Sequence, residues 1–305
     1  MANIRRYVYF YQISWINEND NVIFKNHDFF KKVFNKVCGV EKFEGYWKSI
    51  EEYSKLNEEN WIFGIISKTK TTDFPLKQNL DNHNLSSLEL NENEGLYHPT
   101  HFAVFKGTIL LFEYNFEGFR VNSTLKNKIN NYLKKHKIEG IKEVQIKPVI
   151  REDLKKILLD SKVRDIQISI APGKIDILKD VNDIGEMFRN VNDFPDLTLN
   201  LGFSLGKRRS NKFYDKMDKI KDSFSNFLSD DKIDSLEKFI IKVKTDEGID
   251  SINLLDYIFK VNVEFLKLDD KSRAIDSKSA FESIKTIFLR YNHDLDDLLV
   301  GDLND

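Results

Sequence analysis

The fold of this chain is decided by the stretch Tyr97–Val121, which reads YHPTHFAVFKGTILLFEYNFEGFRV. Two runs of residues with high strand propensity, HFAVF and TILLFEYN, lie on either side of the dipeptide Lys106-Gly107. A glycine between two hydrophobic runs supplies the positive φ that a tight turn requires. The stretch therefore predicts a β-hairpin, with Glu113 as a polar residue of its second strand.

Strand and helix patterns alternate on both sides of this hairpin. The segment RRYVYFYQISWI at residues 5–16 is rich in β-prone residues and predicts a strand. Residues 30, 33, 34 and 37 are apolar at helical spacing, which predicts a helix capped by Asn26 or Asp28 and ended by Gly39. Further strands are expected at residues 61–76, 142–150 and 163–172, and a helix capped by Ser123. Residues 1–175 are therefore predicted to form a mixed-sheet α+β domain.

The second part of the chain, residues 176–305, is expected to form a smaller domain of helices and a β-hairpin. Apolar residues at helical spacing predict an amphipathic helix at 211–231. Turn residues at Thr245–Gly248 predict a hairpin whose arms cover residues 236–265. A last helix begins near Ser277 and runs into an acidic C-terminus. The predicted fold class is α+β for both domains.

The composition excludes several classes of protein. The 305 residues carry a formal net charge of −2, so a role with nucleic acid would need a local basic patch. A single cysteine, Cys38, excludes an internal disulfide and is interpreted as a small buried side chain near the end of a helix. No apolar run approaches the roughly 18–20 residues that span a bilayer. A cytoplasmic protein without a cofactor is expected.

No segment carries a specific catalytic or metal-binding motif. His98 and His101 are three residues apart in a β-prone run, and such positions point to opposite faces of a strand. They are therefore poorly placed to chelate one metal ion and are interpreted as turn residues. No metal site is predicted.

A weak alternative is a metal-dependent nuclease of the restriction type. Such enzymes place an acidic residue on one strand and E/Q-x-K on the next, around a Mg²⁺-bound water. Glu113, Gln145 and Lys147 could supply these groups, since VQIK places the last two side chains on one strand face. The pattern is short, however, and it ends at once in Pro148.

A basic stripe is the clearest candidate for contact with nucleic acid. It lies in the segment GKRRSNKFYDKMDKIK and consists of Lys207, Arg208, Arg209, Lys212, Lys216 and Lys219. Such a row of cations could neutralise several phosphates in a salt-dependent manner. Asp215, Asp218 and Asp222 lie within the same helix and could instead pair with these lysines. A second basic segment, KNKINNYLKKHK, has few acidic residues.

The order of these segments resembles the phage-exclusion proteins of the RexA type. The resemblance is carried by HFAVFKGTILLFEYNFEGFR, VQIKPVIRED and IQISI, and later by FIIKVKTDEGIDSINLLDYIFKV. It covers about two thirds of the chain, and its motifs are mostly apolar. The resemblance implies a homodimeric, DNA-binding, non-enzymatic protein of anti-phage defence, acting as the sensing half of a pair with a companion effector protein.

The sequence thus predicts a defence protein that binds nucleic acid, with duplex DNA as the expected partner. Two alternatives stay open. One is the nuclease described above, and the other is a protein-interaction module that recognises a phage protein. In the last case the basic stripe would be incidental.

Overall fold

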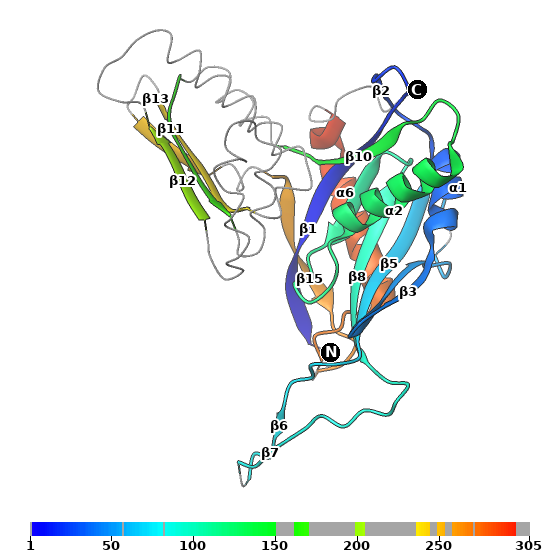
Figure 1. Cartoon of the computed structure of the whole chain (residues 1–305), viewed down its shortest axis with the longest axis vertical. Helices are drawn as coiled ribbons and strands as arrows, with labels where there is room; N and C mark the ends of the chain where they lie inside the picture. The colour runs from blue at the N-terminus through cyan, green and yellow to red at the C-terminus, as the bar shows by residue number, and fades with distance from the viewer. Residues whose placement is uncertain are drawn as a thin grey trace. The chain divides into compact units, whose positions relative to one another are not determined.

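The computed structural model describes residues 2–56, 58–81, 83–150, 162–170, 199–204, 236–244, 249–253, 258–270 and 272–296. The chain forms two compact units (Figure 1). The first comprises Met1–Ile146 and Lys260–Leu295, and the second comprises Lys147–Phe259 and Asp296–Asp305. The boundary expected near residue 175 falls inside the second unit, and the last helix belongs to the first. The predicted α+β class is confirmed, with sheet predominating.

A large, curled sheet forms the centre of the first unit. Its strands follow the order β10-β1-β9-β8-β5-β4-β3, and β15 and β2 also pair with β1. The strands are β1 (Asn3–Ile16), β2 (Val22–Ile23), β3 (Gly39–Phe43), β4 (Tyr46–Glu52), β5 (Trp61–Lys70), β8 (Leu96–Phe105), β9 (Ile109–Glu113), β10 (Glu143–Pro148) and β15 (Lys260–Leu266). Strands distant in sequence thus become neighbours, which brings residues of both segments of the first unit together.

The predicted hairpin is confirmed in β8 and β9. Phe102 pairs with Phe112, and the strands are antiparallel. Lys106 and Gly107 at the turn have φ values of 50° and 77°, the left-handed region that two-residue hairpin turns use. A Cβ at Gly107 would lie 2.8 Å from the carbonyl oxygen of Asn26, so both the backbone conformation and the space require glycine here.

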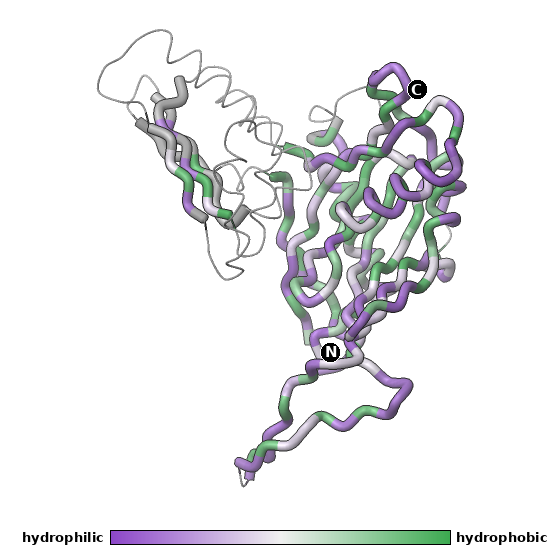
Figure 2. Tube along the Cα trace, viewed as in Figure 1, coloured by the Kyte–Doolittle hydropathy of each residue, from purple (hydrophilic) through white to green (hydrophobic). Residues whose placement is uncertain are grey.

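Helices cover both faces of this sheet, as Figure 1 shows with α2 in front and α6 behind. The first face packs α1 (His27–Val37) and α2 (Val121–His136) against apolar side chains that include Tyr11, Phe102 and Phe112. The other face packs α6 (Ser277–Asp296), where Phe281 contacts Phe63 with ring centroids 5.2 Å apart. Figure 2 shows the corresponding apolar residues along the strands. Since neighbouring residues of a strand alternate between faces, the central strands β1, β5, β8 and β9 contribute to two apolar layers.

Of the helix N-caps predicted for α1 and α2, the one for α1 is confirmed. Asn26 caps α1, because its Oδ1 accepts a hydrogen bond of 3.0 Å from the backbone of Phe29. The prediction that Ser123 caps the next helix is wrong, since α2 begins two residues earlier. Val121 is fully buried, so core packing sets the start of this helix without a side-chain cap.

The strands β11 (Lys162–Ile170), β12 (Leu199–Ser204), β13 (Leu236–Lys244) and β14 (Ile249–Asn253) form an antiparallel sheet in the second unit, in the order β12-β11-β13-β14. Pairing of β13 with β14 confirms the hairpin predicted around Thr245–Gly248. The expectation that its second arm extends to residue 265 is wrong. Lys260–Leu266 instead pairs with the first half of β1, which has no other partner on that edge among the described residues.

In the described residues of the long polar segment between β5 and β8, the strands are two very short ones, β6 (Lys77–Gln78) and β7 (Leu85–Ser86). This agrees with the irregular connection that its polar composition predicts. Among the described residues, no helix has the length and apolar character needed to cross a membrane.

Candidate functional site

A buried polar network lies between the sheet and the start of α6. Glu113 at the end of β9 and His101 in the middle of β8 both point to the α6 face, and neither side chain is exposed to solvent. Arg6 reaches them from β1, where its side chain is 11% exposed. Ser277, the first residue of α6, completes the network and is partly exposed. Side chains from β1, β8, β9 and α6 thus form one connected network that includes Glu113.

Every polar atom of this carboxylate and of the histidine ring has a partner. Arg6 Nη1 donates to Glu113 Oε2 at 2.6 Å. Glu113 Oε1 lies 2.5 Å from His101 Nδ1 and also accepts from the backbone N–H of His101 at 3.2 Å. The other ring nitrogen, Nε2, lies 2.9 Å from Ser277 Oγ. Nη2 of Arg6 donates to the carbonyl oxygen of Arg273, and this hydrogen bond anchors Arg6 to the loop before α6.

Electrostatics keep this carboxylate ionised. Burial alone would raise the pKa of Glu113, because a charge is costly away from water. The hydrogen bonds and positive charge supplied by His101, together with the charge of Arg6, outweigh burial and hold the pKa below its ordinary value. The network therefore stabilises the fold more when Glu113 is charged than when it is protonated.

Acid is expected to unfold the first unit when Glu113 becomes protonated. A lowered folded-state pKa contributes stability above the unfolded-state pKa, about 4.3, and this stability is lost as the pH falls through the folded-state value. Arg6→Gln removes one of the groups that lower the pKa, so its acid unfolding should begin at higher pH. Tryptophan fluorescence is a suitable probe, because Trp15, Trp47 and Trp61 all lie in the first unit.

The control is Arg5→Gln, which removes an exposed ion pair with Glu264 on the neighbouring strand. This variant should keep the wild-type acid midpoint. An identical midpoint for Arg6→Gln and the wild type would contradict the assigned role of Arg6.

The two histidines are not turn residues, so that prediction is wrong. Both lie within β8, and their opposite directions agree with the spacing argument. His101 lies under α6, whereas His98 lies 3.5 Å from Glu117 with its side chain 17% exposed. The buried apolar residues that follow His101 extend the strand through both histidines.

The residues proposed for a nuclease have other partners. Both oxygens of Glu113 are bound by Arg6 and His101. Gln145 lies in β10 and donates its amide to Glu143 at 3.2 Å, and Lys147 lies in the same strand. Within the described part of the chain, no group of three His, Cys, Asp or Glu side chains could hold a metal ion.

The predicted basic stripe Lys207, Arg208, Arg209, Lys212, Lys216 and Lys219 lies outside the described residues. The described residues contain another basic surface, which sequence reasoning missed. It lies where β3 and β5 end and β4 begins, on the side of the sheet where α2 begins. We call it the lysine–aromatic face, and its members are Phe43, Tyr46, Lys48, Lys68 and Phe119.

Aromatic rings and ammonium groups alternate on the lysine–aromatic face. The rings of Phe43 and Tyr46 are stacked with centroids 4.9 Å apart, and Phe119 follows at 5.6 Å from Tyr46. Lys48 Nζ lies 5.1 Å from the Phe43 centroid and 5.8 Å from that of Phe119. Lys68 Nζ lies 5.3 Å from Tyr46 and 5.8 Å from Phe119. Cation–π attraction therefore holds both lysines over the rings.

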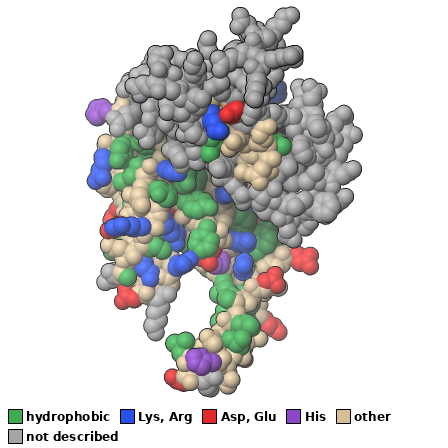
Figure 3. Space-filling model, turned by 90° about the vertical axis from the view of Figure 1, so that its left-hand side faces the viewer, with side chains coloured by type: hydrophobic (Ala, Val, Ile, Leu, Met, Phe, Trp, Pro, Cys, Tyr) green, Lys and Arg blue, Asp and Glu red, His purple; other side chains and the backbone are tan. Residues whose placement is uncertain are grey.

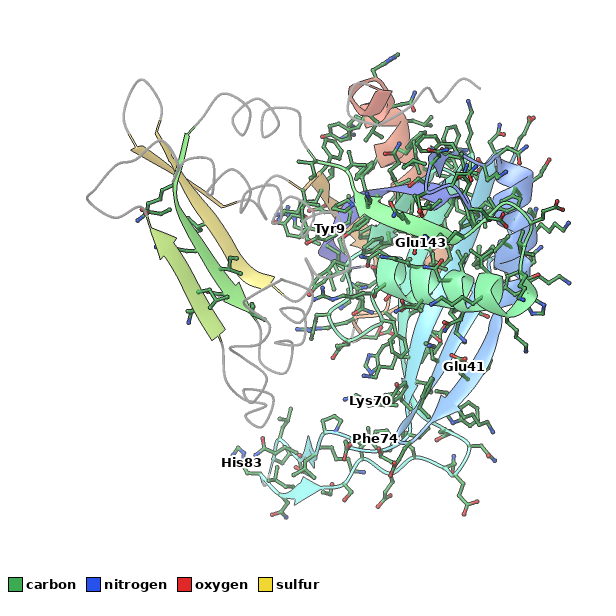
Figure 4. The ribbon with its side chains drawn as sticks, turned by 45° about the horizontal axis from the view of Figure 1, so that its top comes forward. Tyr9, Glu41, Lys70, Phe74, His83 and Glu143 are labelled. Atoms are coloured by element: carbon green, nitrogen blue, oxygen red, sulfur yellow. The ribbon has the colours of Figure 1, made fainter. Side chains whose placement is uncertain are left out.

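The lysine–aromatic face has a surplus of positive charge. Glu41 on β3 binds two lysines, Lys48 at 3.0 Å and Lys128 of α2 at closer range. The hydrogen bond from Lys128 is the main cause that lowers the pKa of Glu41, with a smaller contribution from Lys48. Lys68 has no carboxylate within ion-pair distance among the described residues, and Lys70 extends the same side of β5 (Figure 4). Figure 3 shows one side of the molecule with basic and hydrophobic side chains interspersed.

Cys38 follows the last residue of α1 and is only partly buried. Burial and, secondarily, the charge of Glu52 raise the pKa of its thiol to about 11. It therefore stays protonated near neutral pH, which does not suit a nucleophile. This agrees with the structural interpretation of the cysteine.

Comparison with protein-family models finds no match to this chain, and comparison with curated proteins finds none either.

Proposed function

We propose that this protein binds nucleic acid and that the lysine–aromatic face is one of its contact surfaces. The observation that carries the proposal is the clustering of Lys48 and Lys68 over three aromatic rings, with Lys128 held beside Lys48 through Glu41. The basic stripe at residues 207–219 is proposed as a second contact. The resemblance to phage-exclusion proteins motivates the wider proposal of an anti-phage defence protein that acts as a homodimer with a companion effector.

The charge of this face suits phosphate. Lys68 has no carboxylate within ion-pair distance among the described residues, and each lysine that replaces a condensed counterion contributes salt-dependent affinity. The net charge of the whole chain is −2, so a local surplus of this kind is what would direct a polyanion to this surface.

The rings add a second kind of contact. The exposed fraction of Phe43 is 43%, so part of its surface can accept a ligand. Aromatic side chains beside lysines on a sheet surface provide stacking positions for unpaired bases, while the lysines follow the backbone. Comparing single-stranded and duplex oligonucleotides will show whether stacking contributes to binding.

Replacing Lys48 and Lys68 with glutamine is expected to weaken binding and to make it less dependent on salt. For a duplex, each lost phosphate contact reduces the slope of log K against log salt by about 0.9. The measurement is fluorescence anisotropy of a labelled duplex and of one of its strands, titrated at several salt concentrations. A Lys207/Arg208/Arg209→Ala variant, tested in parallel, examines the basic stripe.

The control variant is Lys25→Gln with Lys106→Gln. Both lysines also lie over a single aromatic ring, but they are at the opposite end of the sheet. This control should bind like the wild type. Absence of binding to either oligonucleotide at low salt would overturn the proposal. Binding that is unchanged in Lys48→Gln/Lys68→Gln would exclude the lysine–aromatic face as the contact.

A further inference from the structure

We infer that Ser277 is an activated nucleophile, with His101 as its general base and Glu113 as the group that orients the base. The three side chains form an unbroken chain of hydrogen bonds, from Ser277 Oγ to His101 Nε2 at 2.9 Å and from His101 Nδ1 to Glu113 Oε1 at 2.5 Å. This order of serine, histidine and carboxylate is the arrangement that acyl-transfer enzymes use on unrelated folds. The inference concerns a different site from the lysine–aromatic face and is independent of the nucleic-acid proposal.

The carboxylate fixes the tautomer of the histidine. Ionised Glu113 has only acceptor atoms, so the proton between Oε1 and His101 resides on Nδ1. In the neutral form of the ring, which a general base requires, Nε2 carries a lone pair and accepts the hydroxyl proton of Ser277. The backbone N–H of His101 also donates to Glu113, which holds the two residues in register. The ring is thus oriented to remove a proton from Ser277.

Arg6 has a positioning role in this arrangement. Its Nη1 donates to Glu113 Oε2 at 2.6 Å, whereas His101 binds Oε1. Nη2 of Arg6 donates to the carbonyl oxygen of Arg273. Since Arg273 is four residues before Ser277, the same arginine links the carboxylate to the loop that presents the serine. Arg6 would not touch the reacting atoms.

The burial of Glu113, His101 and Ser277 suits a buried base beside a more exposed nucleophile. His101 and Glu113 are inaccessible to solvent, which strengthens their interaction and excludes competing water. Ser277 is partly exposed, as a residue that meets a reagent from solvent must be. Its place at the first residue of a 20-residue helix puts it at the positive end of the helix dipole, where developing negative charge is stabilised.

The chemical class of substrate is an activated acyl compound such as an ester or thioester. Ser277 Oγ would attack the carbonyl carbon while its proton passes to His101 Nε2. Collapse of the tetrahedral intermediate breaks the bond to the leaving group, which takes that proton and departs as an alcohol or thiol. Water, deprotonated by the same nitrogen, then hydrolyses the acyl-serine and releases the carboxylic acid.

The test is labelling of the folded, full-length protein with a fluorophosphonate probe. Ser277 Oγ displaces fluoride from phosphorus, so a covalent adduct forms and its mass and position can be read by mass spectrometry. Stoichiometric labelling at Ser277 is expected, and none after heat denaturation. His101→Gln should slow labelling by at least about 100-fold, the usual contribution of a general base.

Ser277→Ala removes one hydroxyl and should abolish the adduct. The matched control is Ser279→Ala, because this serine lies on the same turn of α6 but its backbone, not its side chain, bonds to Asp276. It should label like the wild type. Circular dichroism checks that each variant is folded. Failure of the native wild-type protein to react, or an adduct that persists in Ser277→Ala, would show that the network is structural only.

Discussion

Glu113→Ala is expected to destabilise the first unit by about 3–5 kcal/mol, the cost of leaving a buried charge without its partner. The substitution leaves the guanidinium of Arg6 without its carboxylate and Nδ1 of His101 without an acceptor, and both groups are almost fully enclosed. It also creates a small cavity under α6. Urea unfolding followed by tryptophan fluorescence measures the effect.

The matched control is Glu117→Ala. This glutamate also faces a histidine, His98, but its side chain is 40% exposed. Exposed substitutions of this kind usually change stability by less than about 0.5 kcal/mol. If Glu113→Ala were no more destabilising than Glu117→Ala, the buried network would not contribute to the fold.

Gly64→Ala is expected to destabilise the first unit by about 1–3 kcal/mol through overpacking. Gly64 pairs with Phe102 across β5 and β8, and the phenyl ring lies over the glycine. A Cβ at residue 64 would lie only 2.3 Å from the tip of that ring. Phe102 is fully buried and contacts Phe34 edge-on at 5.7 Å, so the ring cannot move aside without disturbing α1.

A double-mutant cycle separates this clash from an effect on the strand itself. Phe102→Leu shortens the side chain, so Gly64→Ala should cost less in that background than in the wild type. Equal costs in both backgrounds would mean that the intrinsic properties of the strand, and not contact with Phe102, explain the requirement for glycine.

Local sequence signals account for much of the first unit. The hairpin at Lys106-Gly107 and α1 were predicted from turn chemistry and apolar spacing, and both are confirmed. The adjacent strands β3 and β4 were missed because most of their side chains are exposed. At such an edge the alternation between apolar and polar residues, which reveals a half-buried strand, is weak.

The buried network could be predicted only in part. The sequence identifies Glu113 as an acidic residue in an apolar strand, but the residues that bind it lie far away in sequence. Arg6 is 107 residues distant, and Ser277 is separated from His101 by 176. The burial of His101 could have been predicted from its neighbours. Ala103 and Phe105 lie two and four residues further along the strand, so they share a face with His101, and this face packs against a helix.

The interrupted first unit has a consequence for synthesis on the ribosome. The first half of β1 finds its edge partner only when Lys260–Leu266 has been translated, after the Lys147–Phe259 segment of the second unit. At synthesis rates of about 5–20 residues per second, the segment between residues 146 and 260 takes roughly 6–23 s to emerge. During that interval the nascent chain carries an unpaired β1 edge and an uncovered apolar layer awaiting α6. A chaperone that binds extended apolar segments would therefore find its main substrate in the earliest-made third of this polypeptide, well before release.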